Sequence, residues 1–437
     1  MLIQPKTFFA IHMFESKPYE DSAGKLEVRE PMVQSGLLGE HETYSFGWQE
    51  QDSVELVQQS VTDCFNVIGS SAVVIYGAGA HTTQYWDCIS RLNVVAIADK
   101  NEGLWGEKLN GLPIISPQEI GTYSSNVVIS SRAYEDNIYT ELSQLYPMAE
   151  LFKLYGSEFM ATALENWCTE LKSRVLAFKP DLLIHTPTHV KENIPKSFFI
   201  NLKRHLPNLK ILTIWWDYDE ENEESGYLEY ERDVLEYADL VIENSNASRL
   251  EKMYQGLAPY EKHSNPERVI FHPTWFDPSL FYDCGREPKE IKIALFGSIV
   301  GERAYWVDIL KAHFGSDFHH FGGVSGEHRN PLPIREYAKL LRSTKIVVNT
   351  QTYGFRSQCK GKVREALQCG AILLEQDNYE TRVFNKSYNY QNIFYFSSEE
   401  TLIGEITKLL SSDLTVQRVS AKNICYIWTK LIFQLLK

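Results

Sequence analysis

Residues 360–374 read Lys-Gly-Lys-Val-Arg-Glu-Ala-Leu-Gln-Cys-Gly-Ala-Ile-Leu-Leu and carry the pattern that decides the fold. They predict a basic loop that opens a short helix, a glycine that ends the helix, and a buried strand. Lys360, Lys362 and Arg364 bring positive charge to the start of the helix, where the helix dipole already favours an anion. Glu365 follows one turn in, where its carboxylate can accept hydrogen bonds from a diol. The segment therefore suits a nucleoside diphosphate.

Short apolar runs alternate with helical patterns on both sides of this segment. Nearly all-apolar runs of this length are typical of parallel strands that are buried on both faces. They fall into three consecutive series, which predicts an α/β protein throughout. The runs are 72–76, 94–98 and 126–130 in the first series, 181–185, 210–215, 240–243 and 269–272 in the second, and 291–296, 318–321, 345–349, 370–374 and 392–396 in the third.

These series divide the chain into four parts. Residues 70–156 are predicted to form a small Rossmann-like module, because a strand, a glycine turn, a helix, a second strand and an acidic residue follow one another there. Residues 157–284 and 285–437 are predicted to form two further Rossmann-like lobes. Residues 1–69 mix short apolar runs with acidic loops, and no role is predicted for them.

The opening segment resembles the donor-site signature of group 1 glycosyltransferases of the GT-B fold, and more closely that of the spore-maturation-protein-like glycosyltransferases. That signature reads K-x-x-E-A-x-x-x-G, and Lys362, Glu365, Ala366 and Gly370 fall on it. The resemblance implies two facing Rossmann-like lobes, with Lys362 on the donor diphosphate and Glu365 on the ribose. The family often has a glutamate eight residues earlier that contacts the transferred sugar. This chain has Ser357 there, which leaves the donor sugar open.

Three further stretches support the resemblance. Phe296-Gly-Ser298 followed by Arg303 resembles the glycine turn and basic residue that flank the donor phosphates. Residues 343–349 resemble the strand before the signature, and residues 271–281 resemble the linker between the lobes. His319 and His320 would lie near the nucleotide base. The implied donor site comprises Gly297, Ser298, Arg303, Lys360, Lys362 and Glu365.

The lobe at 157–284 offers candidates for the acceptor side. His185 follows a buried strand and can serve as the base for an acceptor hydroxyl, as can His189, although a lone histidine at a strand end is commonly structural. Asp217 is expected to face the cleft between the lobes, so His185 and Asp217 are the catalytic candidates. Asp217 and Asp219 also form an Asp-x-Asp pair, which is the metal-nucleotide motif of the GT-A fold.

The Rossmann-like module carries Gly77-x-Gly79-x-x-Thr82, and Asp99 stands 20 residues after Gly79. Two glycines let a phosphate approach the backbone, and the acid can hold a ribose hydroxyl. Thr82 occupies the place of a third glycine, which weakens the pattern for a full dinucleotide. The module resembles the small Rossmann modules appended to sugar-modifying enzymes. Nucleotide binding by Gly77, Gly79 and Asp99 and a role as a folded spacer both stay open.

Composition excludes some classes of protein. Lys and Arg total 43 against 57 Asp and Glu, and a net charge of −14 argues against bulk nucleic-acid binding. The 7 scattered cysteines indicate reduced thiols and a cytoplasmic protein. No apolar run approaches the ~20 residues that span a bilayer. The apolar stretch 424–437 fits either a peripheral membrane contact or, preferably, a terminal helix that crosses back onto the first lobe.

Together these patterns predict a cytoplasmic, metal-independent glycosyltransferase with a GT-B pair of lobes and an accessory module. The donor would be a nucleotide sugar, UDP- or GDP-linked, which is a substrate, so that no separate cofactor is expected. The acceptor would be a glycan or another hydroxyl compound. The alternatives are a nucleotide-sugar-binding protein without activity, prompted by Ser357, and a metal-dependent GT-A-like transferase that uses Asp217 and Asp219.

Overall fold

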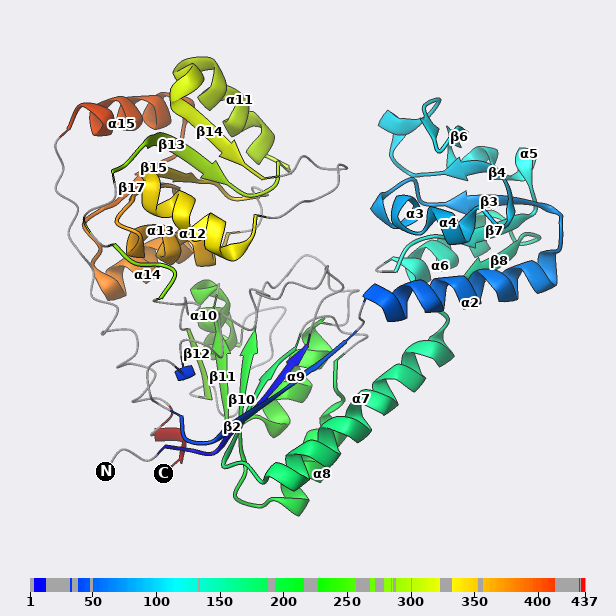
Figure 1. Ribbon diagram of the computed structural model, residues 1–437, viewed down its shortest axis with the longest axis horizontal. Coiled ribbons are helices and arrows are strands. Elements are labelled where there is room, and N and C mark those ends of the chain that lie inside the picture. Colours follow the sequence, from blue (N-terminus) through cyan, green and yellow to red (C-terminus); the bar gives the residue numbers. More distant parts are fainter. Residues whose placement is uncertain are drawn as a thin grey trace.

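The computed structural model shows three α/β bodies (Figure 1). We call them the module, the central lobe and the carboxy-terminal lobe, and each is built on one sheet. All strand pairs within the three sheets are parallel except one in the module, which confirms the predicted α/β class. The structure describes residues 4–12, 32–33, 38–47, 50–132, 134–187, 193–215, 227–244, 246–256, 268–271, 279–283, 285, 288–299, 301–322, 332–352, 357–412, 432 and 434–436.

The carboxy-terminal lobe has a five-stranded parallel sheet. Neighbouring residues such as Val347 and Val348 point to opposite faces and are both fully buried, so helices must cover both sides. The sheet order is β14 (Phe318–Phe321), β13 (Ile291–Phe296), β15 (Thr344–Asn349), β16 (Ile372–Gln376) and β17 (Ile393–Phe396). These strands lie within two residues of the predicted ones.

Helices pack on both faces of this sheet (Figure 1). On one face α11 (Arg303–Phe314) and α15 (Glu399–Ser411) bury Leu310 and Leu402 against it. The other face is covered by α12 (Ile334–Ser343), α13 (Gly361–Gln368) and α14 (Tyr379–Tyr388). The helix predicted from residues 360–374 is therefore α13, and its amino terminus lies at the edge where the parallel strands end.

The central lobe corrects the predicted division of the chain at residue 69. Its sheet has the order β12 (Val269–Phe271), β11 (Leu240–Glu243), β10 (Lys210–Trp215), β9 (Leu182–Thr186), β1 (Thr7–His12) and β2 (His41–Phe46). Thus β1 is an inner strand, with Phe9 opposite Ile184 of β9 and Thr43 of β2. The amino-terminal segment is part of this lobe, and the lobe is discontinuous in sequence.

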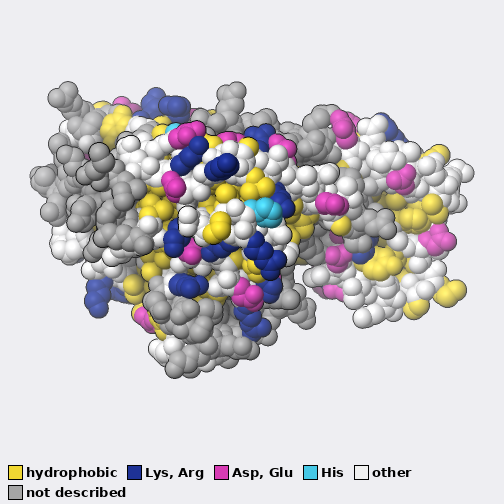
Figure 2. Space-filling view, turned by 90° about the horizontal axis from the view of Figure 1, so that it is seen from below, with side chains coloured by type: hydrophobic (Ala, Val, Ile, Leu, Met, Phe, Trp, Pro, Cys, Tyr) yellow, Lys and Arg dark blue, Asp and Glu magenta, His cyan; other side chains and the backbone are white. Residues whose placement is uncertain are grey.

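Four helices complete the central lobe: α7 (Ser157–Phe178), α8 (Lys196–His205), α9 (Tyr227–Tyr237) and α10 (Ala247–Gln255). The last turn of α8 is basic, with Lys203, Arg204 and His205. Figure 2 shows the molecule from below. Lysine and arginine side chains gather in the middle of this view, and hydrophobic side chains are visible on the module at the right.

The module is inserted between β2 and β9 of the central lobe. Its chain enters through α2 (Glu50–Ile68) and leaves into α7. The sheet order is β5 (Lys108–Leu109), β6 (Leu112–Ile115), β4 (Asn93–Ala98), β3 (Ala72–Tyr76), β7 (Asn126–Ile129) and β8 (Glu150–Lys153). The helices are α3 (Ala80–Gln84), α4 (Trp86–Ile89), α5 (Ile120–Tyr123) and α6 (Glu135–Leu145), with the 3-10 turns η1 (Glu102–Leu104) and η2 (Pro117–Glu119).

One apolar cluster joins the two lobes. It contains Phe9 and Leu182 of the central lobe together with Phe296 and Val363 of the carboxy-terminal lobe. Ile432 belongs to the same cluster, and the described end of the chain lies beside the central lobe (Figure 1). Within the described residues, every helix is too short or too polar to cross a bilayer.

Candidate functional site

A glycine turn at the end of β13 forms the centre of the candidate site. Gly297 has a φ of +118°, and its N–H donates to the carbonyl of Phe321 at 2.8 Å. A Cβ added at Gly297 would lie 2.8 Å from Nζ of Lys362 and 3.1 Å from Nη1 of Arg303. The backbone conformation therefore requires glycine here, and a side chain would also displace the two cations.

Three cations converge on this turn, and we call Gly297, Arg303, Lys360 and Lys362 the cationic cradle. In the first turn of α13, Lys362 donates from Nζ to the carbonyl of Phe296 at 2.6 Å. Arg303 opens α11 and donates to the carbonyl of Ser298 at 2.7 Å. Nζ of Lys360 donates to Oγ1 of Thr352 at 2.9 Å and to the carbonyl of Thr350 at 3.2 Å. The structure thus brings the predicted residues Gly297, Ser298, Arg303, Lys360 and Lys362 together.

The cradle carries positive charge that carboxylates do not neutralise directly. Within the described part of the chain, neither Lys362 nor Arg303 forms an ion pair, and their partners are carbonyl and hydroxyl oxygens. Burial, together with the charges of the neighbouring Arg303 and Lys360, lowers the pKa of Lys362 to about 7. Burial also lowers the pKa of Arg303. An anion in the cradle would relieve this repulsion.

Glu365 faces the core more than the cradle. It is only 6% exposed, and its Oε2 accepts a hydrogen bond from the Tyr337 hydroxyl at 2.6 Å. Burial raises the pKa of this carboxyl group. One of its oxygens is thus already engaged, so the predicted contact between Glu365 and a ribose stays a prediction. Arg364, the third basic residue of the segment, is buried in the core and does not join the cradle.

Glu375 is a buried acid near the cradle that the sequence patterns did not single out. It is the last buried residue of β16. Its Oε2 accepts a hydrogen bond from Nδ2 of Asn349 at 2.7 Å, and its Oε1 accepts one from Nδ2 of Asn378 at 3.0 Å. Burial raises its pKa to about 7, although these hydrogen bonds and the charge of Lys360 lower it. A glutamate inside an otherwise apolar strand is the signal that could have found it.

The two histidines of β14 differ in position. His320 donates from Nε2 to the carbonyl of Gly297 at 2.8 Å, so it supports the cradle turn, and burial lowers its pKa. His319 is exposed, with its ring stacked on Phe321. A nucleotide base near either residue stays a prediction.

The lobes meet through polar contacts beside the apolar cluster. The carboxylate of Glu380 in α14 accepts hydrogen bonds from the first turn of α10, from the N–H of Ala247 and from the N–H of Ser248 at 3.2 Å. Asn246 donates from Nδ2 to the carbonyl of Ser357 at 2.6 Å. Ser357, which stands where the resembling family often has a glutamate, therefore lies at the junction of the lobes.

The acceptor side is only partly described. His185 is fully buried, and its ring centroid lies 4.7 Å from that of Phe199 and 6.5 Å from that of Phe46. Its Nδ1 lies 3.4 Å from the Tyr237 hydroxyl. This corrects the prediction that His185 faces an acceptor, because the side chain belongs to the core of the central lobe. Asp217, Asp219 and His189 lie outside the described residues.

The glycine turn of the module forms a backbone hydrogen bond to Asp99 of the same module. Gly77 has a φ of +116°, and a Cβ there would lie 2.9 Å from the carbonyl oxygen of Ser130, so a side chain does not fit. Oδ2 of Asp99 accepts from the N–H of Ala78 at 2.7 Å, which occupies an amide that a phosphate would use. The buried hydroxyl of Thr82 hydrogen-bonds Ser130 Oγ at 2.8 Å. The structure brings Gly77, Gly79 and Asp99 together, but their contacts close the turn internally.

Two family models match separate parts of the chain. Residues 281–428 match a model described as glycosyl transferase-like, and this range contains the cationic cradle. Residues 69–149 match a model described as C2185-like, N-terminal, and this range contains every strand of the module sheet except β8. No curated protein matches the chain.

Solved structures give distant similarities. The chain is 11% identical to sucrose-phosphate synthase from Thermosynechococcus elongatus, with a TM-score of 0.41 over 84% of this chain and 99% of the other. For Anabaena HepE in complex with UDP-glucose, the identity is 11% and the TM-score 0.39, over 83% and 99% of the chains. For UDP-GlcNAc 2-epimerase from Neisseria meningitidis bound to UDP-GlcNAc, the identity is 10% and the TM-score 0.37, over 83% of this chain and 99% of the other.

The family match thus falls on the lobe that holds the cradle, and a second Rossmann-like lobe packs against that lobe as the GT-B fold requires. Residues 281–428 are thus similar to the glycosyl transferase-like family.

Proposed function

We propose that the cationic cradle binds the diphosphate of a nucleotide-sugar donor and that the sugar is transferred to an acceptor hydroxyl. One observation carries this proposal: Lys362 and Arg303 meet at Gly297, with carbonyl oxygens rather than carboxylates as close partners. Burying two cations side by side costs free energy in the empty protein. A diphosphate supplies the missing negative charge, because both cations can donate charge-assisted hydrogen bonds to its oxygens.

In this proposal the cradle stabilises the leaving group, which is the nucleoside diphosphate. When the bond between the sugar and the diphosphate breaks, negative charge grows on the diphosphate oxygen. Cations that are already in place stabilise that charge without reorganising, which lowers the barrier. Lys362 and Arg303 are held by their hydrogen bonds to Phe296 and Ser298, so they are positioned before the donor arrives. This role can be filled without a metal ion, and a metal-independent mechanism is part of the proposal.

The donor is proposed to be UDP- or GDP-linked and the acceptor a glycan or another hydroxyl compound. The acceptor would approach from the central lobe, whose strand ends face the same junction. Asp217 remains the proposed base at that side, and His185 is withdrawn because of its burial. Ser357 at the junction would put a neutral side chain beside the transferred sugar, so a panel of nucleotide sugars is needed to identify the sugar.

Donor binding is tested by Lys362→Ala with Lys408→Ala as the matched control. Lys408 is an exposed lysine of α15 whose side chain is 69% exposed. We expect Lys362→Ala to weaken donor binding by about 1–3 kcal/mol, since a charge-assisted hydrogen bond is lost. Lys408→Ala should bind the donor as the parent does. Titration calorimetry with UDP and GDP sugars measures both variants and identifies the nucleotide.

Turnover is measured on the same preparations. Release of nucleoside diphosphate from the bound donor is expected in the parent and the control. A nucleotide sugar that raises the melting midpoint of the parent but releases no nucleoside diphosphate would support binding without activity instead. An unchanged donor affinity in Lys362→Ala would remove the cradle from the site.

A further inference from the structure

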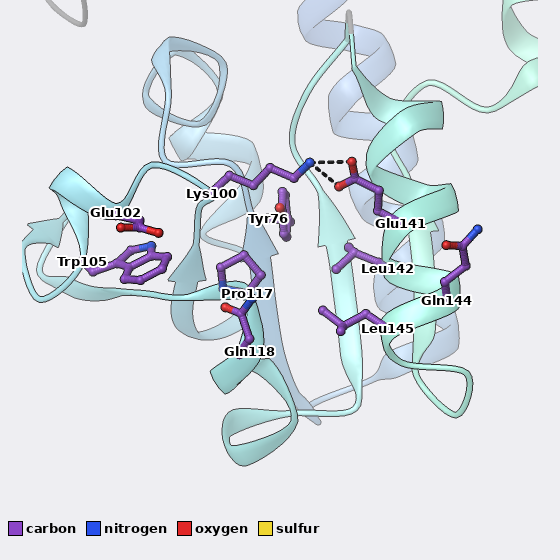
Figure 3. A pocket seen from close by; sticks show the side chains of 10 residues that line it. All are labelled: Tyr76, Lys100, Glu102, Trp105, Pro117, Gln118, Glu141, Leu142, Gln144 and Leu145. Atoms are coloured by element: carbon purple, nitrogen blue, oxygen red, sulfur yellow. Dashed lines mark hydrogen bonds and ion pairs between the residues drawn. The ribbon is translucent and has the colours of Figure 1, made fainter. Parts of the chain in front are cut away.

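A cavity lies in the module, away from the cradle. Its volume is about 530 Å³, within the ~300–1,000 Å³ of small-molecule sites. Figure 3 shows side chains that converge on it from the end of β3, the loop after β4, η2 and α6. Trp105, Pro117 and Gln118 stand on one side, Glu141, Leu142 and Leu145 on the other, and Tyr76 lies between them.

The wall that carries Trp105 is built before any ligand arrives. The carbonyl of Asp99 accepts a hydrogen bond from Nε1 of Trp105 at 2.8 Å, and the Asp99 carboxylate accepts from the N–H of Asn101 at 2.8 Å. Asn101 in turn caps η1 through the N–H of Gly103. Asp99 therefore holds the loop from residue 99 to Trp105 in place. In a dinucleotide-binding module, an acid at this position would instead face a ribose. This leaves the Trp105 side chain 38% exposed at the cavity.

The opposite walls are fixed as well. Pro117 is buried, and its carbonyl accepts a hydrogen bond from the Tyr146 hydroxyl at 2.7 Å. A capping box formed by Ser116 and Glu119 holds the turn that presents Gln118. The ion pair between Lys100 and Glu141 links the loop after β4 to α6 across the cavity (Figure 3). A site whose walls are already ordered binds a ligand with little loss of conformational entropy.

The charges of the cavity disfavour an anion. Lys100 is paired with Glu141, and Glu102 adds a second carboxylate, so the lining carries one net negative charge. This is the reverse of the cationic cradle, where neutral carbonyl and hydroxyl oxygens hold the lysines and the arginine. A nucleotide or a sugar phosphate would be repelled here.

The remaining groups suit a neutral hydroxylated ring. A pyranose has an apolar face of C–H groups that packs on an aromatic ring such as Trp105, while its hydroxyls donate to carboxylates and accept from amides. The lining supplies both kinds of partner, in Glu102 and Glu141 and in Gln118 and Gln144. Leu142 and Leu145 add the apolar surface on the other side.

Exposed aromatic and aliphatic side chains are also concentrated in this part of the chain. Of the twelve large hydrophobic residues that are exposed in the described ranges, eight lie between Phe65 and Met148. They include Trp105 and Leu145, which line the cavity. These two exposed side chains add apolar contact area at the cavity.

We infer that this cavity is a binding site for a neutral sugar ring of a glycan, with Trp105 as its stacking surface. Its assignment to the acceptor or product of the enzyme rests on the proposed function, whereas sugar binding itself does not. A glycan held here would keep its growing or finished end near the catalytic lobes, because the module is connected to the central lobe at both ends.

The test uses the full chain and saturation-transfer NMR with maltotriose and triacetylchitotriose as neutral probes and UMP as the anionic comparator. We expect at least one neutral probe to bind and Trp105→Ala to weaken that binding about tenfold or more. The matched control is Tyr123→Ala, which removes a 40% exposed aromatic of the same module outside the cavity lining. That variant should bind as the parent does.

Two further variants keep the result interpretable. Leu145→Arg obstructs the cavity from the α6 side without touching the bond between Trp105 and Asp99, so it should abolish sugar binding even if Trp105→Ala disturbs its loop. Lys362→Ala should leave neutral-sugar binding unchanged, which separates this site from the donor site. Failure of both neutral probes to bind the parent, equal binding by Leu145→Arg, or stronger binding of UMP at this cavity would each overturn the inference.

Discussion

Lys362 is a lysine whose charge depends on what lies beside it. In the empty cradle its ammonium is buried next to Arg303 and Lys360, and burial lowers its pKa to about 7. A bound diphosphate would favour the charged form and raise that pKa again. The residue therefore couples donor binding to proton uptake.

We predict that donor binding above neutral pH takes up close to one proton and that affinity falls as the pH rises through the Lys362 pKa. The free protein must protonate Lys362 before the cradle is fully cationic, so each pH unit above that pKa weakens binding by up to about tenfold. Calorimetry in two buffers of different ionisation enthalpy measures the proton. Equal heats in the two buffers at pH 8, with Lys362→Met as the control without an ammonium, would contradict the coupling.

The same lysine affects folding stability in a defined direction. Its pKa is about 7 in the folded chain against 10.5 ordinarily, so the unfolded chain binds more protons between these values. The contribution of Lys362 to the free energy of unfolding therefore rises with pH across this window. Exchange of this buried ammonium for an uncharged side chain removes that pH dependence.

A further residue-scale prediction concerns metal ions. The charges of Lys362 and Arg303 meet where the diphosphate is proposed to bind, so transfer should persist in excess EDTA. Initial rates of nucleoside diphosphate release with and without chelator measure this. Rates that collapse in EDTA and return with Mn²⁺ would point instead to Asp217 and Asp219.

At the scale of elements, contiguous motifs were predictable and distant partners were not. The strand and helix periods of residues 291–374 predicted β13, β15, β16 and α13, because each pattern lies within one short window. The cradle followed from the resemblance, since its glycine turn and basic residues sit at the ends of those elements. Glu375 escaped notice because its partner Asn349 lies on the neighbouring strand β15, 26 residues earlier in the chain, and only the fold brings the two together.

Two predictions about the central lobe failed, for different reasons. The strand β1 pairs with β9, whose residues lie about 175 positions later in the chain, and no local pattern encodes such a pairing. The sequence TFFAIH was visible as a short apolar run but could not be assigned to a lobe. His185 was misjudged because alternation along a strand does not tell which face a polar residue takes when helices bury both faces.

Helix α10 supports an element-scale prediction, because its first turn is capped by a residue of the other lobe. Glu380→Ala leaves the amides of Ala247 and Ser248 without their acceptor and should lower the free energy of unfolding by about 1–3 kcal/mol. Hydrogen exchange of the α10 amides should accelerate, since the cap that joins the lobes is lost. Glu380→Gln keeps one acceptor oxygen and should lose less.

The control for that comparison is Glu405→Ala, which removes a surface carboxylate of α15 paired only with Lys408 among the described residues. It should leave α10 exchange as in the parent. If the α10 amides exchange equally fast in Glu380→Ala and in Glu405→Ala, Glu380 does not hold the lobes together.

On the scale of the whole molecule, the module should be separable from donor chemistry. A Cβ at Gly79 meets nothing within 4 Å, whereas one at Gly77 meets the carbonyl of Ser130 at 2.9 Å. We predict that Gly79→Val folds and releases nucleoside diphosphate from the donor within a few-fold of the parent, while Gly77→Val destabilises the module. Circular dichroism and thermal melting establish folding for both. A folded Gly79→Val chain without donor turnover would place an essential ligand at this turn.

The discontinuous central lobe has a consequence for the order in which the molecule folds during synthesis. Strand β1 is made before β9, its inner neighbour in the sheet, which follows more than 170 residues later, so until then β1 has only β2 to pair with. The module between them contains all the partners of its own sheet and can fold in that interval. Phe8 and Phe9 of β1 therefore stay exposed to solvent on the nascent chain while a complete neighbouring body forms. A ribosome-bound chain that ends just before β9 would carry a protease-resistant module attached to an amino-terminal segment that is readily cleaved.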